Sequence, residues 1–335
     1  MKKLLDDSVN AARDALAGFA AAHPDLIQVQ GLAGDAPVIV SRAAGPTPGK
    51  VGVISGGGSG HEPMHVGFIG HGMLDAVAPG PMFTAPTPDQ ILAAIKVADG
   101  DAGVLAIIKN YTGDVLNFEM GIELAQMEGI EVAAVIVADD VAVENSTFTA
   151  GRRGVAGTVL VEKIAGAAAA RGDSLAEVTA LAGRVCEQVR SMGVALAACT
   201  VPHVGRPSFD LPDDEVEIGI GIHGEPGRRR VPLTSAADVT RQLVAPILAD
   251  LGLNADERVL LFVNGLGGTP LSELYVVYND ARVLLNAAGL VVERSLVGNF
   301  VTALEMQGTS ITIMRLDDEL VALWDAPVTT VALRW

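Results

Sequence analysis

The sequence predicts an α/β protein of two domains, each a sheet flanked by helices, with a substrate site between them. Short apolar runs alternate with helical patterns in the order strand, loop, helix and strand over residues 50–140. The chain has 335 residues, of which 50% are hydrophobic. It is therefore longer than one typical domain and can bury a large core.

The first half contains three runs that predict strands, at residues 50–55, 103–110 and 131–140. A helical pattern over residues 111–126 separates the last two. Because these strands are apolar almost without interruption, we expect a parallel sheet that is covered on both faces.

Two helices are expected in the middle of the chain. The first is an Ala-rich amphipathic helix over residues 155–172 that ends at Gly172, and the second covers residues 174–193. Its cap is expected at Asp173 or Ser174. Further strands are predicted at residues 194–201, 215–222, 258–265 and 309–316. This helical stretch divides the strands, so we place the domains at residues 1–184 and 185–335.

Charge and composition exclude several classes of protein. The formal net charge is -17 at pH 7, so a polyanion such as DNA is repelled. Two cysteines are too few for a disulfide framework and fit a reducing compartment. Asp6, Asp7 and Arg13 interrupt any signal-peptide core, and no apolar run is long enough to cross a membrane. We expect a cytoplasmic protein that binds neither nucleic acid nor membrane.

The loop after the first of these strands reads "SGGGSGHEPMH" and matches the H-E-x-x-H motif of zinc proteases. Pro63 fits only the first turn of a helix, so we expect the helix to begin near Glu62 or Pro63. His61 then lies before the helix and cannot pair with His65 on one face, which disfavours zinc, and we expect no metal. The glycine run either lets backbone N–H groups bind a ligand or forms a tight turn. His65 and His71 are expected to be structural.

The next loop places Lys109 at a strand end and Asp114 at or just before a helix start. Asp114 is either an ordinary N-cap or a functional carboxylate. The carboxyl ends of parallel strands line the ligand crevice of α/β sheets, so we expect His61, Lys109 and Asp114 to lie close together. An imidazole and a carboxylate in that position can take a proton from a hydroxyl group.

A third loop reads "IGIGIHGEPG", residues 218–227, where His223 has glycine at 221 and 224. The histidine is either a turn residue or a nucleophile with little bulk around its ring. Glu225 is close enough in sequence to orient that ring. Two basic spots, residues 151–154 and 228–230, are expected to be solvated surface, with a partner or phosphate contact as the alternative.

Long blocks of the sequence resemble the substrate-binding K subunits of dihydroxyacetone kinases, the DhaK family. These blocks include "SGGGSGHEPMH", "IIKNYTGDVLNFE", "TAGRRGVAGTVLVEKI" and "GIGIHGEPG". The likeness extends through "NGLGGTPLSELY" and "ALWDAPV" and covers essentially the whole chain.

The resemblance implies a role for each loop. His223 would bind dihydroxyacetone covalently as a hemiaminal, and the glycines around it would leave room for the ketone. Asp114 would be the acid/base group, with His61 assisting. The groups that hydrogen-bond the substrate would be Gly58, Ser59, Gly60, His61 and Lys109. A covalent bond to a carbonyl carbon also rejects glycerol, which has no carbonyl group.

The resemblance also implies partners. This chain would carry no cofactor and would form a homodimer. A separate L subunit would hold ADP or ATP with magnesium, and a phosphotransferase-system carrier would recharge bound ADP. Two alternatives stay open: a co-regulator that senses dihydroxyacetone without phosphorylating it, and a kinase subunit for a related short ketose such as erythrulose.

Overall fold

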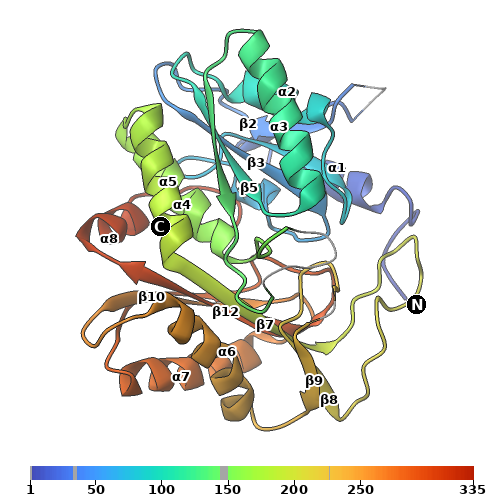
Figure 1. Ribbon diagram of the computed structural model, residues 1–335. Coiled ribbons are helices and arrows are strands. Elements are labelled where there is room, and N and C mark those ends of the chain that lie inside the picture. The colour runs from blue at the N-terminus through green and yellow to red at the C-terminus, as the bar shows by residue number, and fades with distance from the viewer. Residues whose placement is uncertain (1, 33–35, 144–149, 226) are drawn as a thin grey trace.

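The computed structural model describes residues 2–32, 36–143, 150–225 and 227–335 and contains two six-stranded sheets. The first sheet has the order β1-β2-β4-β3-β5-β6 and the second has the order β11-β10-β12-β7-β8-β9. The predicted α/β class, with helices flanking each sheet, is confirmed (Figure 1).

The first sheet is built from β1 (Ile27–Gln30), β2 (Ile39–Arg42), β3 (Gly52–Ser59), β4 (Ala76–Met82), β5 (Val104–Lys109) and β6 (Val132–Val137). Strands β3, β5 and β6 are parallel neighbours, as predicted; β4, which was not predicted, pairs parallel with β3, and β1 and β2 add an antiparallel edge. The second sheet is built from β7 (Val189–Ala197), β8 (Glu215–Ile218), β9 (Arg229–Pro232), β10 (Arg258–Gly265), β11 (Val291–Gly298) and β12 (Gln307–Leu316). Among its described strand pairs, β10 and β11 are parallel and the others are antiparallel.

The α-helices of the described residues are α1 (Ala11–Ala22), α2 (Pro88–Ala98), α3 (Thr112–Met127), α4 (Gly157–Arg171), α5 (Leu175–Gln188), α6 (Ala236–Leu251), α7 (Leu271–Ala287) and α8 (Asp318–Asp325). Helices α2 to α8 lie in three layers, one outside each sheet and one between the sheets, and α1 packs on β1. Helices α2 and α3 share a core with the outer face of the first sheet, and α6 and α7 with the outer face of the second. Helices α4, α5 and α8 lie between the sheets.

Strand β10 shows how the layers are specified. Val259, Leu261 and Val263 pack in the outer core with α6 and α7, whereas Leu260 and Phe262 pack in the central core. Successive side chains of a strand point to opposite faces, so an unbroken apolar run fits a sheet that is buried on both sides.

Helix α4 corrects the prediction of an amphipathic helix. Its residues from Gly157 to Ala169 are all buried, because it lies between the two sheets and has no solvent face. Its predicted end is confirmed, since Gly172 caps it in the left-handed conformation that glycine tolerates. Ser174 caps α5 through a capping box with Glu177.

The strand that follows α5 begins earlier than predicted, at Val189, so α5 is shorter than residues 174–193. The predicted division at residue 184 therefore falls inside α5. All strands of the first sheet end by Val137 and all strands of the second begin at Val189 or later. One apolar core joins residues of both halves, and the division into two domains stays a prediction.

The predicted helix at Glu62 or Pro63 is wrong. In the part of the chain that the structure describes, this loop is followed by a short 3₁₀ helix, η1 (Val66–Phe68), and not by an α-helix. Gly67, Gly70 and Gly72 lie in the segment that the helix would need, and glycine weakens a helix. In the described residues, no helix is long and apolar enough to cross a membrane.

Candidate active site

A cavity of about 650 Å³ lies where loops of the two halves meet. Its lining includes Gly58 at the end of β3, Phe83 after β4, Tyr111 after β5, Asp114 in α3, and His223 after β8. Strands β3 and β5 are parallel neighbours, so their carboxyl ends meet at the same edge of the sheet. This placement confirms the expectation that the two predicted loops lie together.

His223 comes from the second half and is held by Glu225. Its backbone N–H donates to Oε2 of Glu225 at 2.9 Å, and Nδ1 lies 3.0 Å from Oε1. A carboxylate only accepts hydrogen bonds, so Nδ1 carries a proton, and in the neutral form of the ring Nε2 holds the free lone pair. The orienting contact expected for Glu225 is present.

Glu225 remains ionised although it is buried. Burial by itself raises the pKa of a carboxyl group, but the hydrogen bond from His223 and the charges of His223 and Arg153 outweigh it. Together they lower the pKa of Glu225 to about 2. The group facing His223 is therefore a carboxylate at neutral pH.

The glycines beside His223 serve protein neighbours, which corrects the interpretation that they leave room for a ligand. A Cβ at Gly221 would lie 2.0 Å from Oε2 of Glu225, and one at Gly224 would lie 2.6 Å from Oγ of Ser208. Gly224 also has φ +78, where side chains are strained. Gly221 lets Glu225 approach the backbone that carries the histidine, and Gly224 leaves room for Ser208. Pro226 of this loop lies outside the described residues.

Aromatic and imidazole rings surround the His223 ring. The ring centroids of Tyr111 and His61 lie 4.6 and 4.7 Å from it, and that of Phe83 lies 5.3 Å away. The His223 side chain is 16% exposed. These packed rings fix its orientation and leave only part of it open to the cavity.

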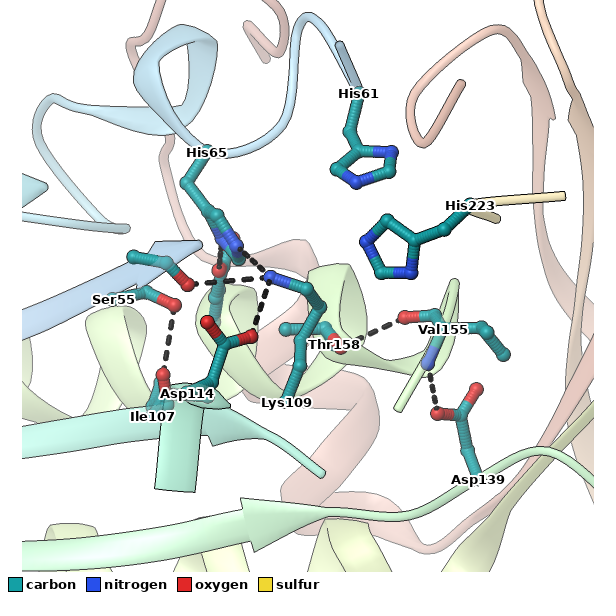
Figure 2. Close-up of polar contacts among 12 residues, drawn as sticks. Ser55, His61, His65, Ile107, Lys109, Asp114, Asp139, Val155, Thr158 and His223 are labelled. Atoms are coloured by element: carbon teal, nitrogen blue, oxygen red, sulfur yellow. Dashed lines mark hydrogen bonds and ion pairs between the residues drawn. The ribbon is translucent and has the colours of Figure 1, made fainter. Parts of the chain in front are cut away.

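His61 is fully buried and oriented by the second half of the chain. Its Nδ1 lies 2.7 Å from the carbonyl oxygen of Thr302, which can only accept, so Nδ1 carries the proton. Nε2 has no hydrogen-bond partner among the described residues. Burial and the nearby charges of His223 and Lys109 hold the pKa of His61 well below its usual value. The ring is therefore neutral, with a free lone pair beside His223 (Figure 2).

Lys109 and Asp114 lie together at the other side of the site. Nζ of Lys109 is 3.9 Å from Oδ2 of Asp114, and both side chains are buried. The N-cap alternative for Asp114 is wrong, because α3 begins at Thr112 and Tyr111 is its N-cap. Asp114 lies in the first turn, where burial raises its pKa and the charge of Lys109 opposes that rise.

The other predicted substrate groups are placed differently. The hydroxyl of Ser59 donates to the carbonyl oxygen of Gly80, and the N–H of Gly60 donates to the carboxylate of Glu62. Ser59 lines a separate hollow beside α1. Gly58 lies between this hollow and the cavity that contains His223, and lines both of them. Direct contacts of Ser59 and Gly60 with a substrate stay predictions.

Two groups near the site were assigned other roles from the sequence. His65 lies 2.8 Å from Nζ of Lys109, and Arg153 is fully buried with its Nε 2.7 Å from Asp140. The expectation of a solvated surface is therefore wrong for Arg153. Its partners, Asp140 and the carbonyl oxygen of Gly219, lie 13 and 66 positions away, and the sequence "GRRG" by itself does not indicate that an arginine is buried.

No group of three or more His, Cys, Asp or Glu side chains within the described ranges is arranged to hold a metal ion. His61 and His65 each use Nδ1 in a different hydrogen bond, to Thr302 and Glu162 respectively. The site combines the imidazole rings of His61, His65 and His223 with the ammonium group of Lys109 and the carboxyl groups of Asp114 and Glu225.

Comparisons with known proteins show the family of this chain. The Dak1 domain family matches residues 17–332. The chain is 51% identical over 334 residues to "PTS-dependent dihydroxyacetone kinase 1, dihydroxyacetone-binding subunit DhaK" of Listeria innocua, covering 99% of this chain and 100% of that protein.

Two solved structures are also similar. The "dihydroxyacetone kinase operon co-activator Dha-DhaQ" has a TM-score of 0.89 and 38% identity, covering 96% of this chain and 97% of the other. The dihydroxyacetone kinase from C. freundii in complex with AMP-PNP and Mg²⁺ has a TM-score of 0.88 and 36% identity. This chain covers 61% of the C. freundii chain, with 99% of its own length matched.

Proposed function

Since this chain belongs to the Dak1 domain family, we propose that it is the dihydroxyacetone-binding subunit of a two-component, phosphotransferase-system-dependent dihydroxyacetone kinase. His223 binds the ketone covalently and Asp114 activates its hydroxyl group for phosphorylation. The observation that carries the proposal is the Glu225 contact, which leaves Nε2 of His223 with a free lone pair beside the cavity.

The covalent step adds Nε2 of His223 to the carbonyl carbon of dihydroxyacetone. The carbonyl π bond breaks, the oxygen takes up a proton from water, and Nδ1 releases one to water, so the product is a neutral hemiaminal and no group leaves. The Glu225 carboxylate at Nδ1 stabilises the positive charge that develops on the ring. The proton on the new hydroxyl group comes from water, and His61, whose free Nε2 lies next to His223, is placed to accept a hydrogen bond from that hydroxyl and to take its proton when the adduct breaks down.

The adduct holds the ketone while a terminal hydroxyl is phosphorylated. An oxygen at about 2.8 Å from both Lys109 and Asp114 would fit the 3.9 Å gap between them. There it would accept a hydrogen bond from Lys109 and donate to Asp114, which takes its proton. Burial raises the pKa of Asp114 and makes this carboxylate a stronger base than an exposed one.

The phosphoryl donor belongs to a partner subunit in this proposal. That L subunit carries ADP or ATP with magnesium, and a phosphotransferase carrier recharges it. The names support this division: the Listeria relative is a subunit of a PTS-dependent kinase, and the longer C. freundii kinase was solved with AMP-PNP and Mg²⁺. We also propose a cytoplasmic homodimer.

Intact-protein mass spectrometry with dihydroxyacetone tests the covalent step. Wild type is expected to gain the mass of one ketone, and His223→Ala is expected to gain none. Glycerol is the matched ligand control, because it has no carbonyl group. An absent adduct in wild type, or an equal adduct in His223→Ala, would contradict the proposal.

A second candidate is a co-regulator that senses dihydroxyacetone, which the likeness to the operon co-activator supports. Both candidates form the adduct, but only the kinase subunit yields dihydroxyacetone phosphate with an L subunit and donor. The pairing of His61 with Asp114 in one site favours the kinase. The same assay with erythrulose decides whether a four-carbon ketose is the substrate.

A further inference from the structure

A buried chain of three side chains ends at Lys109. Nδ1 of His65 lies 2.6 Å from Oε1 of Glu162, and Nε2 of the same ring lies 2.8 Å from Nζ of Lys109. His65 comes from the loop after β3, and Glu162 comes from the centre of α4. All three side chains are almost completely buried, and Figure 2 shows His65 pointing at Lys109 from the side opposite His223.

The contact with His65 occupies one of the hydrogen-bond donors of Lys109. An ammonium group has three N–H donors. One is directed to Nε2 of His65 and a second to the carbonyl oxygen of Gly56 at 3.2 Å. Oδ2 of Asp114, at 3.9 Å, is beyond hydrogen-bond distance, so the third donor is left for an oxygen atom between Lys109 and Asp114.

The tautomer of His65 follows from its two neighbours. An ammonium group only donates, so Nε2 must accept and the proton must be on Nδ1. Burial and the charges of Lys109 and His61 hold the pKa of His65 well below its usual value, which keeps the ring neutral. Burial raises the pKa of Glu162 to about 8. Oε1 can accept the hydrogen bond from Nδ1 whether Glu162 is ionised or protonated, because a protonated carboxyl group still has one accepting oxygen.

We propose that His65 and Glu162 are positioning residues that fix the direction of the Lys109 ammonium group. Glu162 selects the tautomer of His65, His65 takes one donor of Lys109, and the remaining donor is aimed at the substrate hydroxyl that Asp114 deprotonates. This inference rests on the proposed function for its substrate, but the hydrogen-bonded chain itself does not. It gives the second histidine of "HEPMH" a role other than metal binding.

Nitrogen-15 NMR of histidine-labelled protein without ligand tests the chain directly. His65 is expected to have a protonated Nδ1 and an unprotonated Nε2 in wild type. A protonated Nε2 in wild type would overturn the inference, whatever the protein binds.

Steady-state kinetics with an L subunit and donor test the consequence. His65→Leu and Glu162→Leu are expected to raise KM for dihydroxyacetone or lower kcat/KM by about ten- to hundred-fold, the range for a hydrogen bond to a charged group. His65→Gln retains an oxygen that can accept from Lys109 and is expected to recover part of this loss. If His65→Leu is too unstable to purify, His65→Gln and the NMR measurement still decide the question.

Lys163→Met is the matched control. Lys163 follows Glu162 on α4 and is also buried. Its ammonium group donates to the carbonyl oxygen of Leu323 in α8 and does not contact Lys109. We expect it to lose stability without changing KM. Wild-type kinetics in both leucine variants, in protein that forms the His223 adduct, would overturn the inference alone. An absent adduct in wild type would instead remove the proposed function.

Discussion

Glu225→Gln tests whether a buried charge holds the His223 loop. Glutamine has nearly the same shape as the protonated acid, so the substitution removes the charge with little change in volume. Both atoms of His223 that face the carboxylate are donors, and an amide has only one accepting oxygen. We expect the variant to lose stability and to form the hemiaminal more slowly.

The magnitude follows from the pKa of Glu225. Its fall from the ordinary value of 4.5 to about 2 corresponds to about 3 kcal/mol, at roughly 1.4 kcal/mol for each tenfold change. A carboxyl group with a lowered pKa in the folded state stabilises that state above its unfolded pKa. This contribution is complete above about pH 4.5 and is lost as the pH falls toward 2.

Urea unfolding of wild type and Glu225→Gln at several pH values measures this contribution. Fluorescence of Trp324 and Trp335, together with circular dichroism, can follow the transition. The variant is expected to be less stable by about 3 kcal/mol at pH 7. The difference is expected to shrink below about pH 4.5.

Glu187→Gln is the control, because Glu187 is exposed near the end of α5 and its substitution is expected to change stability by less than about 0.5 kcal/mol. A stability difference for Glu225→Gln that stays constant from pH 7 to pH 3, or a variant as stable as wild type, would refute the reasoning.

Three further substitutions test other contacts. Asp114→Asn is expected to keep the adduct but to lower phosphoryl transfer by about 10²- to 10⁴-fold, measured with an L subunit; full turnover would remove Asp114 as the base. Gly57→Ala would place a Cβ 2.2 Å from Nζ of Lys109 and is expected to weaken ketone binding at least tenfold in a titration, so unchanged affinity would contradict the role of Lys109. Gly221→Ala is expected to lower the free energy of unfolding in urea by about 1–3 kcal/mol, because its Cβ would collide with Glu225. Gly183→Ala is the control and is not expected to destabilise the protein, because nothing lies within 4 Å of a Cβ there. Equal effects of the two substitutions would contradict the steric argument.

An element can be predicted from the sequence when its pattern of apolar and polar residues reflects which of its faces are buried. Residues 258–265 form β10 with the predicted bounds, because an unbroken apolar run of this length fits a strand that is buried on both faces. The prediction for α4 was half right: its end is marked by Gly172, but a helix that is buried all round has no polar face to reveal its position.

Some residues of the site could be predicted from the sequence and others could not. His61, Lys109, Asp114 and His223 lie at or after strand ends, and sequence blocks around them resemble a known family. His65 does not stand out, because its partners Lys109 and Glu162 lie 44 and 97 positions away and come from β5 and α4. Such a contact depends on how the sheet and the central helix are packed, which periodicity within one segment does not specify.

Helix α4 also works as a spacer of fixed thickness. Gly166 lies so close to the first half that a Cβ there would be 2.3 Å from Cα of Met73, and α4 packs at the same time toward the second sheet through β7 and α8. Larger side chains on this helix would push apart the sheet that carries Lys109 and the sheet whose loop carries His223. Small residues on α4 therefore help to set the distance between Lys109 and His223. Replacing one of its buried alanines with a larger residue would change that distance without altering either side chain.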